Sequence, residues 1–204
     1  MTPRLVSPLP AVILAGGKSE RMGFPKVKLA RDGNPLILQL AERLLAANWK
    51  LECVVVSDEE LAKWVNHYLH GIPAIINPFP QEGMISSLRL ALKWAESTSP
   101  GLLGWPVDHP LIEIETLQVM RQAATRVNVV VPTFEQKRGH PTWWGKKSWK
   151  LLKSHTADHG ANRLLSVLSL TALNIAEVAV DDPGVLVNID TPESAATFNL
   201  YQAE

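Results

Sequence analysis

The chain has 204 residues, of which 46% are hydrophobic and 20% charged, and its 20 basic and 20 acidic side chains give a formal net charge of zero. This length and apolar content fit one globular domain over residues 1–204, with residues 1–10 as an N-terminal extension. The balanced charge argues against nucleic acid and anionic membranes as partners, because both attract proteins through a basic surface.

The cysteine content and the first residues suggest where the protein works. The single cysteine, Cys53, excludes an intramolecular disulfide and lies in an apolar run, where a buried thiol is expected. The first ten residues contain three prolines and lack the apolar core of a signal peptide. No apolar run reaches the length of a membrane span. We therefore expect a cytoplasmic protein.

Strand and helix patterns alternate along the first two thirds of the chain. Apolar runs predict strands at 11–15, 51–56, 73–77, 102–108 and 128–132. Helical spacing predicts helices at 36–48, 84–96 and 113–126. A further helix is expected to begin with a capping box formed by Ser57 and Glu60 and to end at Gly71. Such repeated units predict an α/β fold with a mainly parallel sheet and helices on both faces.

The last third departs from this alternation. Residues 133–144 are predicted to form a loop and an antiparallel strand, which would be a small antiparallel addition to the sheet. Short helices are expected at 148–155 and 162–168, and strands at 177–180 and 185–189. Thr191 and Pro192 have the residue types of an N-cap and a first helical position, so they predict the start of a last helix.

The loop after the first strand is rich in glycines and cations. It contains Gly16, Gly17, Gly23, Lys18, Arg21 and Lys26. Glycines let backbone N–H groups approach a ligand closely, and cations beside such a loop suit a polyphosphate. The spacing matches neither a P-loop nor the dinucleotide-binding pattern of glycines. A glycine turn with solvated charges is the alternative interpretation.

Two aspartates stand at predicted strand ends. Asp108 ends the strand 102–108, and Asp190 follows the strand 185–189. Ligands of open α/β sheets bind beyond the carboxyl ends of the strands, so both carboxylates could hold Mg²⁺ beside Arg21 and Lys26. That arrangement would serve phosphoryl or nucleotidyl transfer. Either aspartate could instead be only a turn or capping residue. The six histidines lack the spacing of a zinc site.

Six motifs together resemble a known family. They are residues 14–26, Asn77-Pro with 83–89, 106–110, 138–141, 158–163 and 188–193, and they occur in the expected order. The chain is similar to the molybdenum cofactor nucleotidyltransferases, in particular to the molybdopterin cytidylyltransferase-like branch. The Leu-Ala-Gly-Gly spelling at 14–17 resembles the related guanylyltransferase branch instead, so the base stays open between CTP and GTP.

The resemblance implies a Rossmann-like, three-layer nucleotidyltransferase fold and a set of roles. The enzyme would transfer CMP or GMP from an NTP to the terminal phosphate of molybdopterin with Mg²⁺, releasing pyrophosphate. Arg21 and Lys26 would contact the triphosphate, and Asp108 and Asp190 would hold the metal. The nucleotide would lie against Leu14, Ala15, Gly16, Gly17, Lys26, Asn77, Gly83 and Ser87. Arg138, His140 and Arg163 would face the acceptor.

Two other functions remain open at this point. The acceptor could be another phosphorylated small molecule, such as a sugar phosphate, and cations near Arg138 and Arg163 would suit either acceptor. The protein could also be a non-catalytic carrier that delivers molybdenum cofactor through a transient contact with a molybdoenzyme. A pure carrier would not need Asp108, Asp190, Arg21 and Lys26, so their presence favours an enzyme.

Overall fold

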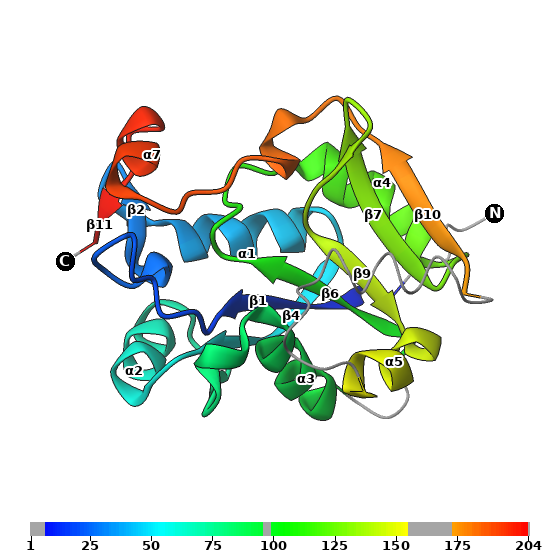
Figure 1. Cartoon of the computed structure of the whole chain (residues 1–204), viewed down its shortest axis with the longest axis horizontal. Coiled ribbons are helices and arrows are strands. Elements are labelled where there is room, and N and C mark those ends of the chain that lie inside the picture. The colour runs from blue at the N-terminus through cyan, green and yellow to red at the C-terminus, as the bar shows by residue number, and fades with distance from the viewer. Residues whose placement is uncertain (1–6, 96–98, 155–172, 204) are drawn as a thin grey trace.

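A central sheet of mixed direction forms the middle layer of the computed structural model, which describes residues 7–95, 99–154 and 173–203 (Figure 1). Its strand order is β10-β7-β9-β6-β1-β4-β5, and β8 pairs with β7 beside this path. Neighbours are parallel except at β9, which is antiparallel to β6 and β7, and at β8. The bounds are β1 (Leu9–Ala15), β4 (Trp49–Val56), β5 (Ala74–Ile76), β6 (Gly101–Pro106), β7 (Val129–Phe134), β8 (Lys137–Arg138), β9 (Thr142–Gly145) and β10 (Ile175–Ala179).

Helices cover both faces of the sheet, as predicted. In Figure 1, α1 and α4 lie on one side of the sheet, and α3 and α5 lie on the other. The central strand β1 alternates between the two cores: Ile13 packs in the cluster that contains Leu40 of α1, and Val12 in the cluster that contains Leu88 of α3. The helices are α1 (Leu36–Ala46), α2 (Glu59–Tyr68), α3 (Met84–Trp94), α4 (Ile114–Ala124), α5 (Trp149–Ser154) and α7 (Pro192–Thr197). The mainly parallel, three-layer α/β fold is therefore confirmed.

The single cysteine and two adjacent tryptophans are buried in these cores. Cys53 is buried, as expected. Trp143 and Trp144 of β9 point to opposite cores and are 0% and 2% exposed, so neither is a surface platform for a base. Among the described residues, no helix has the length and apolar content that crossing a bilayer requires.

A second, three-stranded sheet anchors the segment that follows the glycine loop. It consists of β11 (Tyr201–Gln202), β2 (Leu29–Arg31) and β3 (Asn34–Pro35), all antiparallel. The N–H of Ala203 donates to the carbonyl of Lys28 at 2.7 Å, which brings the two chain regions together, as Figure 1 shows for the red and blue segments. The sequence predicts only a loop after the first strand, so this sheet and the short 3-10 helix η1 (Lys26–Lys28) are corrections to that prediction.

Two other local predictions are wrong. The N-cap of α2 is Asp58, whose carboxylate accepts the Leu61 N–H at 2.9 Å, while Ser57 only donates to that carboxylate. The expected strand 185–189 is absent, because Asp182 accepts the N–H of Gly184 and starts the 3-10 helix η5 (Pro183–Val185).

The N-terminal cap of the last helix is confirmed. The Thr191 hydroxyl accepts the Ser194 N–H at 3.2 Å, and Pro192 is the first residue of α7. The expected helix at 162–168 lies outside the described residues.

Candidate active site

The carboxyl ends of β1 and β6 bring the glycine loop next to Asp108. The strands are parallel neighbours, and the Val107 N–H donates to the carbonyl of Leu14 at 3.0 Å beyond the last paired residues. Asp108 stands two residues past the end of β6. Its carbonyl accepts the Ile189 N–H at 2.8 Å, so the backbone itself holds Asp190 at the same rim.

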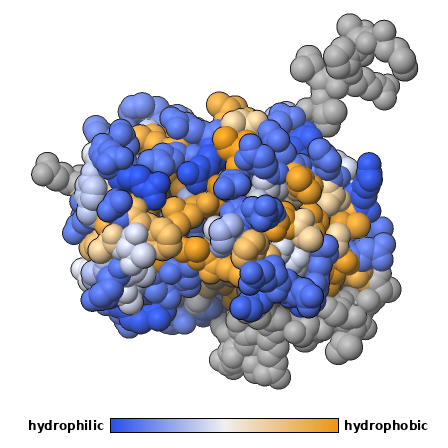
Figure 2. All heavy atoms as spheres, turned by 90° about the horizontal axis from the view of Figure 1, so that it is seen from above, coloured by the Kyte–Doolittle hydropathy of each residue, from blue (hydrophilic) through white to orange (hydrophobic). Residues whose placement is uncertain are grey.

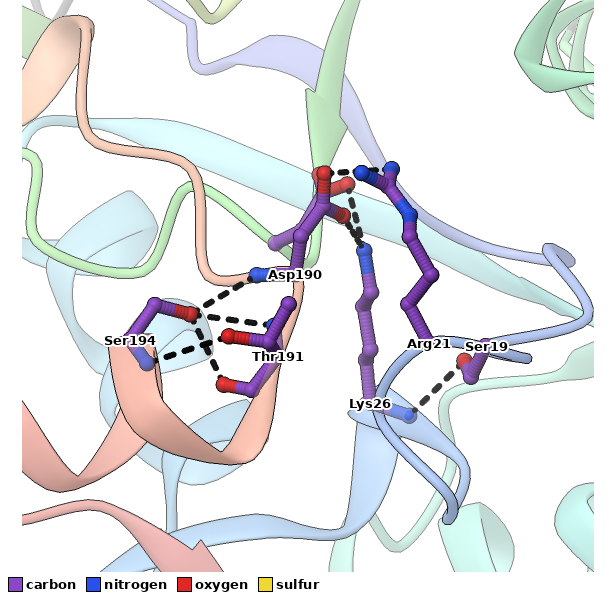
Figure 3. Close-up of polar contacts among 7 residues, drawn as sticks. Ser19, Arg21, Lys26, Asp190, Thr191 and Ser194 are labelled. Carbon is purple, nitrogen blue, oxygen red and sulfur yellow. Dashed lines mark hydrogen bonds and ion pairs between the residues drawn. The ribbon is translucent and has the colours of Figure 1, made fainter.

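Lys26 links the two aspartates (Figure 3). Its ammonium lies 3.1 Å from Asp108 Oδ2 and also contacts Asp190 Oδ1. The guanidinium of Arg21 reaches Asp190 Oδ2 at 2.6 Å from the solvent side, where the Arg21 side chain is 73% exposed. Ser19 Oγ accepts the Lys26 N–H at 3.1 Å and so holds the loop at Lys26. The structure thus brings together the two cations and two carboxylates that the sequence singled out.

These contacts change the titration of Asp190. Burial acts to raise the pKa of this carboxyl, but the hydrogen bonds and charges of Lys26 and Arg21 outweigh that effect and lower it. Asp190 is therefore ionised at neutral pH, where it is paired with both cations.

Two adjoining pockets surround Lys26. The first, of about 180 Å³, is lined by Lys26, Asp108 and the predicted nucleotide-binding residues Leu14, Ala15, Gly16, Gly17 and Ser87. The second, of about 550 Å³, is lined by Arg21, Lys26, Asp190 and the predicted Gly83. Ser19 and Gly17 line both pockets, so the glycine loop forms their common wall. Sequence reasoning missed Ser19, although its position inside the glycine loop was a usable signal.

Asn77 lies behind the first pocket rather than in its wall. Its buried amide Nδ2 donates to Ser86 Oγ at 2.8 Å and Ser87 Oγ at 3.0 Å, and its Oδ1 accepts the Phe79 N–H. All three contacts are inside the protein, so Asn77 positions Ser87. A Cβ atom on Gly16 would lie 2.5 Å from Ser87 Oγ, so a side chain at position 16 would displace the Ser87 hydroxyl.

The residues expected to face the acceptor separate into two places. His140 packs against His109, the residue after Asp108, with 4.5 Å between the centroids of the two tilted rings. Burial, together with the charge of His109, lowers the pKa of His140 to about 4, and burial also lowers the pKa of His109. The Nδ1 atoms of both rings are buried without a hydrogen-bond partner in the described part of the chain. His140 therefore lies near the aspartate rim as a neutral ring, and His109, which sequence reasoning did not select, lies beside it.

Arg138 lies elsewhere and is already paired. Its Nε donates to Glu177 Oε1 of β10 at 2.8 Å, and the two residues line a separate pocket with Asn174. Neither residue lines the pockets around Lys26. Arg163 and the expected turn 158–163 lie outside the described residues.

The donor set suits a hard divalent cation. A single ammonium contacts both Asp108 and Asp190, so the two carboxylates lie close enough to share one cation. Carboxylate oxygens are the ligands that Mg²⁺ prefers, and this ion usually takes only one or two of them from the protein. Within the ranges that the structure describes, no group of three or more metal-ligating side chains occurs.

Comparisons with known proteins bear on the family and the fold of the chain. The family described as MobA-like NTP transferase domain matches residues 11–175. The molybdenum cofactor guanylyltransferase of Rhizobium meliloti is 30% identical over 134 residues, 65% of this chain and 60% of that protein. The enzyme of the same name from Rhizobium rhizogenes is 23% identical over 199 residues, 91% of this chain and 88% of that protein.

A solved structure shows the same fold. The crystal structure of Rv0371c from Mycobacterium tuberculosis superimposes with a TM-score of 0.76 at 20% identity, covering 95% of this chain and 98% of that one. A manganese complex of Rv0371c has also been solved, with a TM-score of 0.69 at 18% identity and coverage of 94% and 97%.

Proposed function

The chain belongs to the MobA-like NTP transferase family, and from this premise we propose that it transfers a nucleotide from GTP to the terminal phosphate of molybdopterin, releasing pyrophosphate. Two findings support GTP over the related donor CTP. Several curated relatives are named molybdenum cofactor guanylyltransferase, and the Leu-Ala-Gly-Gly spelling at 14–17 resembles that branch.

The observation that carries the proposal is the position of Lys26. Its ammonium lies between two carboxylates at the common wall of two pockets, one narrow and one wide. A nucleoside would enter the narrow pocket, and its triphosphate would extend along the glycine loop to Lys26 and Arg21. The two cations would offset the charge that develops on the leaving pyrophosphate.

Asp108 and Asp190 would hold Mg²⁺ in this arrangement. When bound, the ion neutralises triphosphate charge and orients the α-phosphate for in-line attack. The chain's own groups would position the substrate. The glycine loop, which Ser19 holds at Lys26, would bind the triphosphate, and the bond from the Ile189 N–H to the Asp108 carbonyl keeps the two aspartates at one rim. An oxygen of the acceptor phosphate forms the new bond to the α-phosphorus as the bond to pyrophosphate breaks, so no protein nucleophile is needed.

The acceptor would approach from the His140 side of the rim. His140 and His109 are neutral rings beside Asp108 whose Nδ1 atoms are buried, so they would border the approach of the acceptor without adding a positive charge to it. Arg163 would help from the segment outside the described residues. Arg138 would first have to leave Glu177, so its assigned role is weaker than the sequence suggested.

Product formation tests this proposal. The protein is incubated with molybdopterin, Mg²⁺ and each NTP in turn, while pyrophosphate is followed and the pterin product is identified by mass. We expect GTP to give the fastest reaction. Asp108→Asn should abolish it, whereas Asp181→Asn should leave it unchanged, because Asp181 is exposed and lines neither pocket around Lys26.

The other outcomes separate the remaining functions. A fastest reaction with CTP would move the protein to the cytidylyltransferase branch. Pyrophosphate release only with a sugar phosphate would show that the acceptor is a sugar phosphate and not molybdopterin. If no NTP gives a product but molybdenum cofactor binds and reaches a molybdoenzyme, the protein is a carrier.

A further inference from the structure

The turn that follows Asp108 is held by contacts from several distant parts of the chain. The Asp108 carbonyl accepts the Ile189 N–H, and the His109 carbonyl accepts Trp105 Nε1 at 2.9 Å. At the far end of the turn, the Glu113 N–H donates to Asp182 Oδ2 at 2.9 Å. Few of these hydrogen bonds are part of a regular helix or strand, so side chains such as those of Trp105 and Asp182 help to hold the turn in place.

Arg43 holds the middle of this turn. From the last part of α1, its Nη1 donates to the Pro110 carbonyl at 2.7 Å and to the Ile112 carbonyl at 3.0 Å. Burial is the first cause of a lowered pKa for this guanidinium, so its charge carries a desolvation cost. In the part of the chain that the structure describes, the carbonyls of Pro110 and Ile112 receive no backbone hydrogen bond from a helix or a strand, which explains why the cationic side chain of Arg43 lies beside them.

The 3-10 helix η5 also packs closely against this turn. A Cβ atom on Gly184 would lie 2.4 Å from the Leu111 carbonyl oxygen. The turn is therefore held both by the close packing of η5 at Leu111 and by the hydrogen bonds of Arg43. Loss of the guanidinium would free the Pro110 and Ile112 carbonyls while β6 and η5 keep their own contacts.

We propose that Arg43 is a positioning residue for Asp108: it fixes the turn 109–112 and thereby sets the place of the Asp108 carboxylate relative to Asp190. The inference rests on the metal-binding role proposed above for these two aspartates. Arg43 itself lines neither pocket around Lys26, so it acts only through the turn. Groups that orient metal ligands typically change metal affinity 10- to 100-fold when they are removed.

Binding of Mn²⁺ to the protein without nucleotide tests the inference directly, with free Mn²⁺ measured by electron paramagnetic resonance. We expect Arg43→Gln to raise the dissociation constant for Mn²⁺ about 10-fold, at the lower end of that range. Arg43→Lys keeps the charge and one donor, so it should raise the constant about 3-fold, a partial rescue. The Mn²⁺ concentration for half-maximal transfer should shift by the same factors, with little change in kcat at saturating metal.

Arg121→Gln is the matched control. Arg121 also donates to two backbone carbonyls, those of Asn48 at 2.9 Å and Ser7 at 2.8 Å, but these lie just before β4 and β1, at the amino ends of the strands rather than at the carboxyl ends near the aspartates. Its loss should lower the melting temperature without changing Mn²⁺ binding. All four proteins are compared well below their melting temperatures.

The outcomes separate this inference from the proposed function. If Asp108→Asn abolishes Mn²⁺ binding while Arg43→Gln binds Mn²⁺ like the Arg121 control, the positioning role is overturned and the metal role stands. If Asp108→Asn binds Mn²⁺ normally, the metal role itself fails. Should Arg43→Gln not fold, Arg43→Lys decides the matter, and an unchanged dissociation constant in that variant overturns the inference.

Discussion

Replacement of Lys26 by methionine should change metal binding and catalysis in opposite directions. The ammonium of Lys26 contacts both Asp108 and Asp190, and its side chain is only 13% exposed. It therefore occupies carboxylate oxygens that a divalent ion needs, and the ion must displace it. Without nucleotide, Lys26→Met should bind Mn²⁺ more tightly, because the competing cation is gone.

The same change should slow nucleotidyl transfer. One preorganised electrostatic donor is worth ~2–4 kcal/mol in a transition state. At about 1.4 kcal/mol for each tenfold change in rate, kcat/KM should fall by roughly 30- to 1000-fold. Pyrophosphate release at varied GTP concentration measures this loss, and titration with Mn²⁺ measures the gain in affinity.

Lys28→Met provides the control for the Lys26 variant. Lys28 is in the same 3-10 helix and also forms an ion pair at 3.1 Å, with Glu60, but it lines neither pocket. This variant should leave both transfer and Mn²⁺ binding near their original values. Full transfer activity in Lys26→Met would refute the triphosphate contact. Weaker Mn²⁺ binding there would show that Lys26 does not compete with the metal.

Three further predictions concern other residues of the site. Gly16→Ala should lower the free energy of unfolding by about 1–3 kcal/mol through overpacking against Ser87, and adding Ser87→Ala should restore part of it, as denaturant titration will show. The lowered pKa of His140 means that the folded protein resists protonation. Stability should therefore fall from about pH 6.5 towards pH 4, and less so in His140→Gln, which thermal unfolding at several pH values will measure. Arg138→Ala removes a partly exposed ion pair with Glu177 and should change stability by less than about 1 kcal/mol, as chemical unfolding will show.

The elements with strong local patterns could be predicted from the sequence. The apolar run of β1 and the helical spacing of α1 carry their structure within a few consecutive residues, and both were found within a few residues of their bounds. The second sheet could not be predicted, because its two- and three-residue strands depend on pairing between Ala30 and Tyr201 at opposite ends of the chain. Helix caps fail for a different reason: Ser57 and Asp58 are both good caps, and only packing of the following residues decides between them.

Some residues of the candidate site could likewise be predicted from local sequence patterns, and others could not. Strand ends locate Asp108 and the glycine loop, because the carboxyl ends of parallel strands meet at one edge. The position of Asp190 was right although the strand expected before it is absent, because a backbone bond from Ile189 replaces the strand. The sequence assigned Arg138 to the acceptor because of its motif and its positive charge. It could not show that this charge is paired, because the partner Glu177 is on another strand and nothing near Arg138 in sequence indicates it. The role of Arg43 depends wholly on tertiary contacts and gives no local signal.

The hydrogen bond between Ile189 and Asp108 has a consequence for how such an enzyme can diverge. It joins the two ends of an 80-residue stretch, 109–188, directly at the rim. Lengthening a surface loop costs little free energy once its ends are fixed. If the stretch between β7 and β10 faces the acceptor as proposed, insertions and substitutions there would alter acceptor recognition while both aspartates keep their spacing. Selection for a new acceptor would then act on residues other than those that carry out transfer. Acceptor recognition could change while the residues for transfer stay the same.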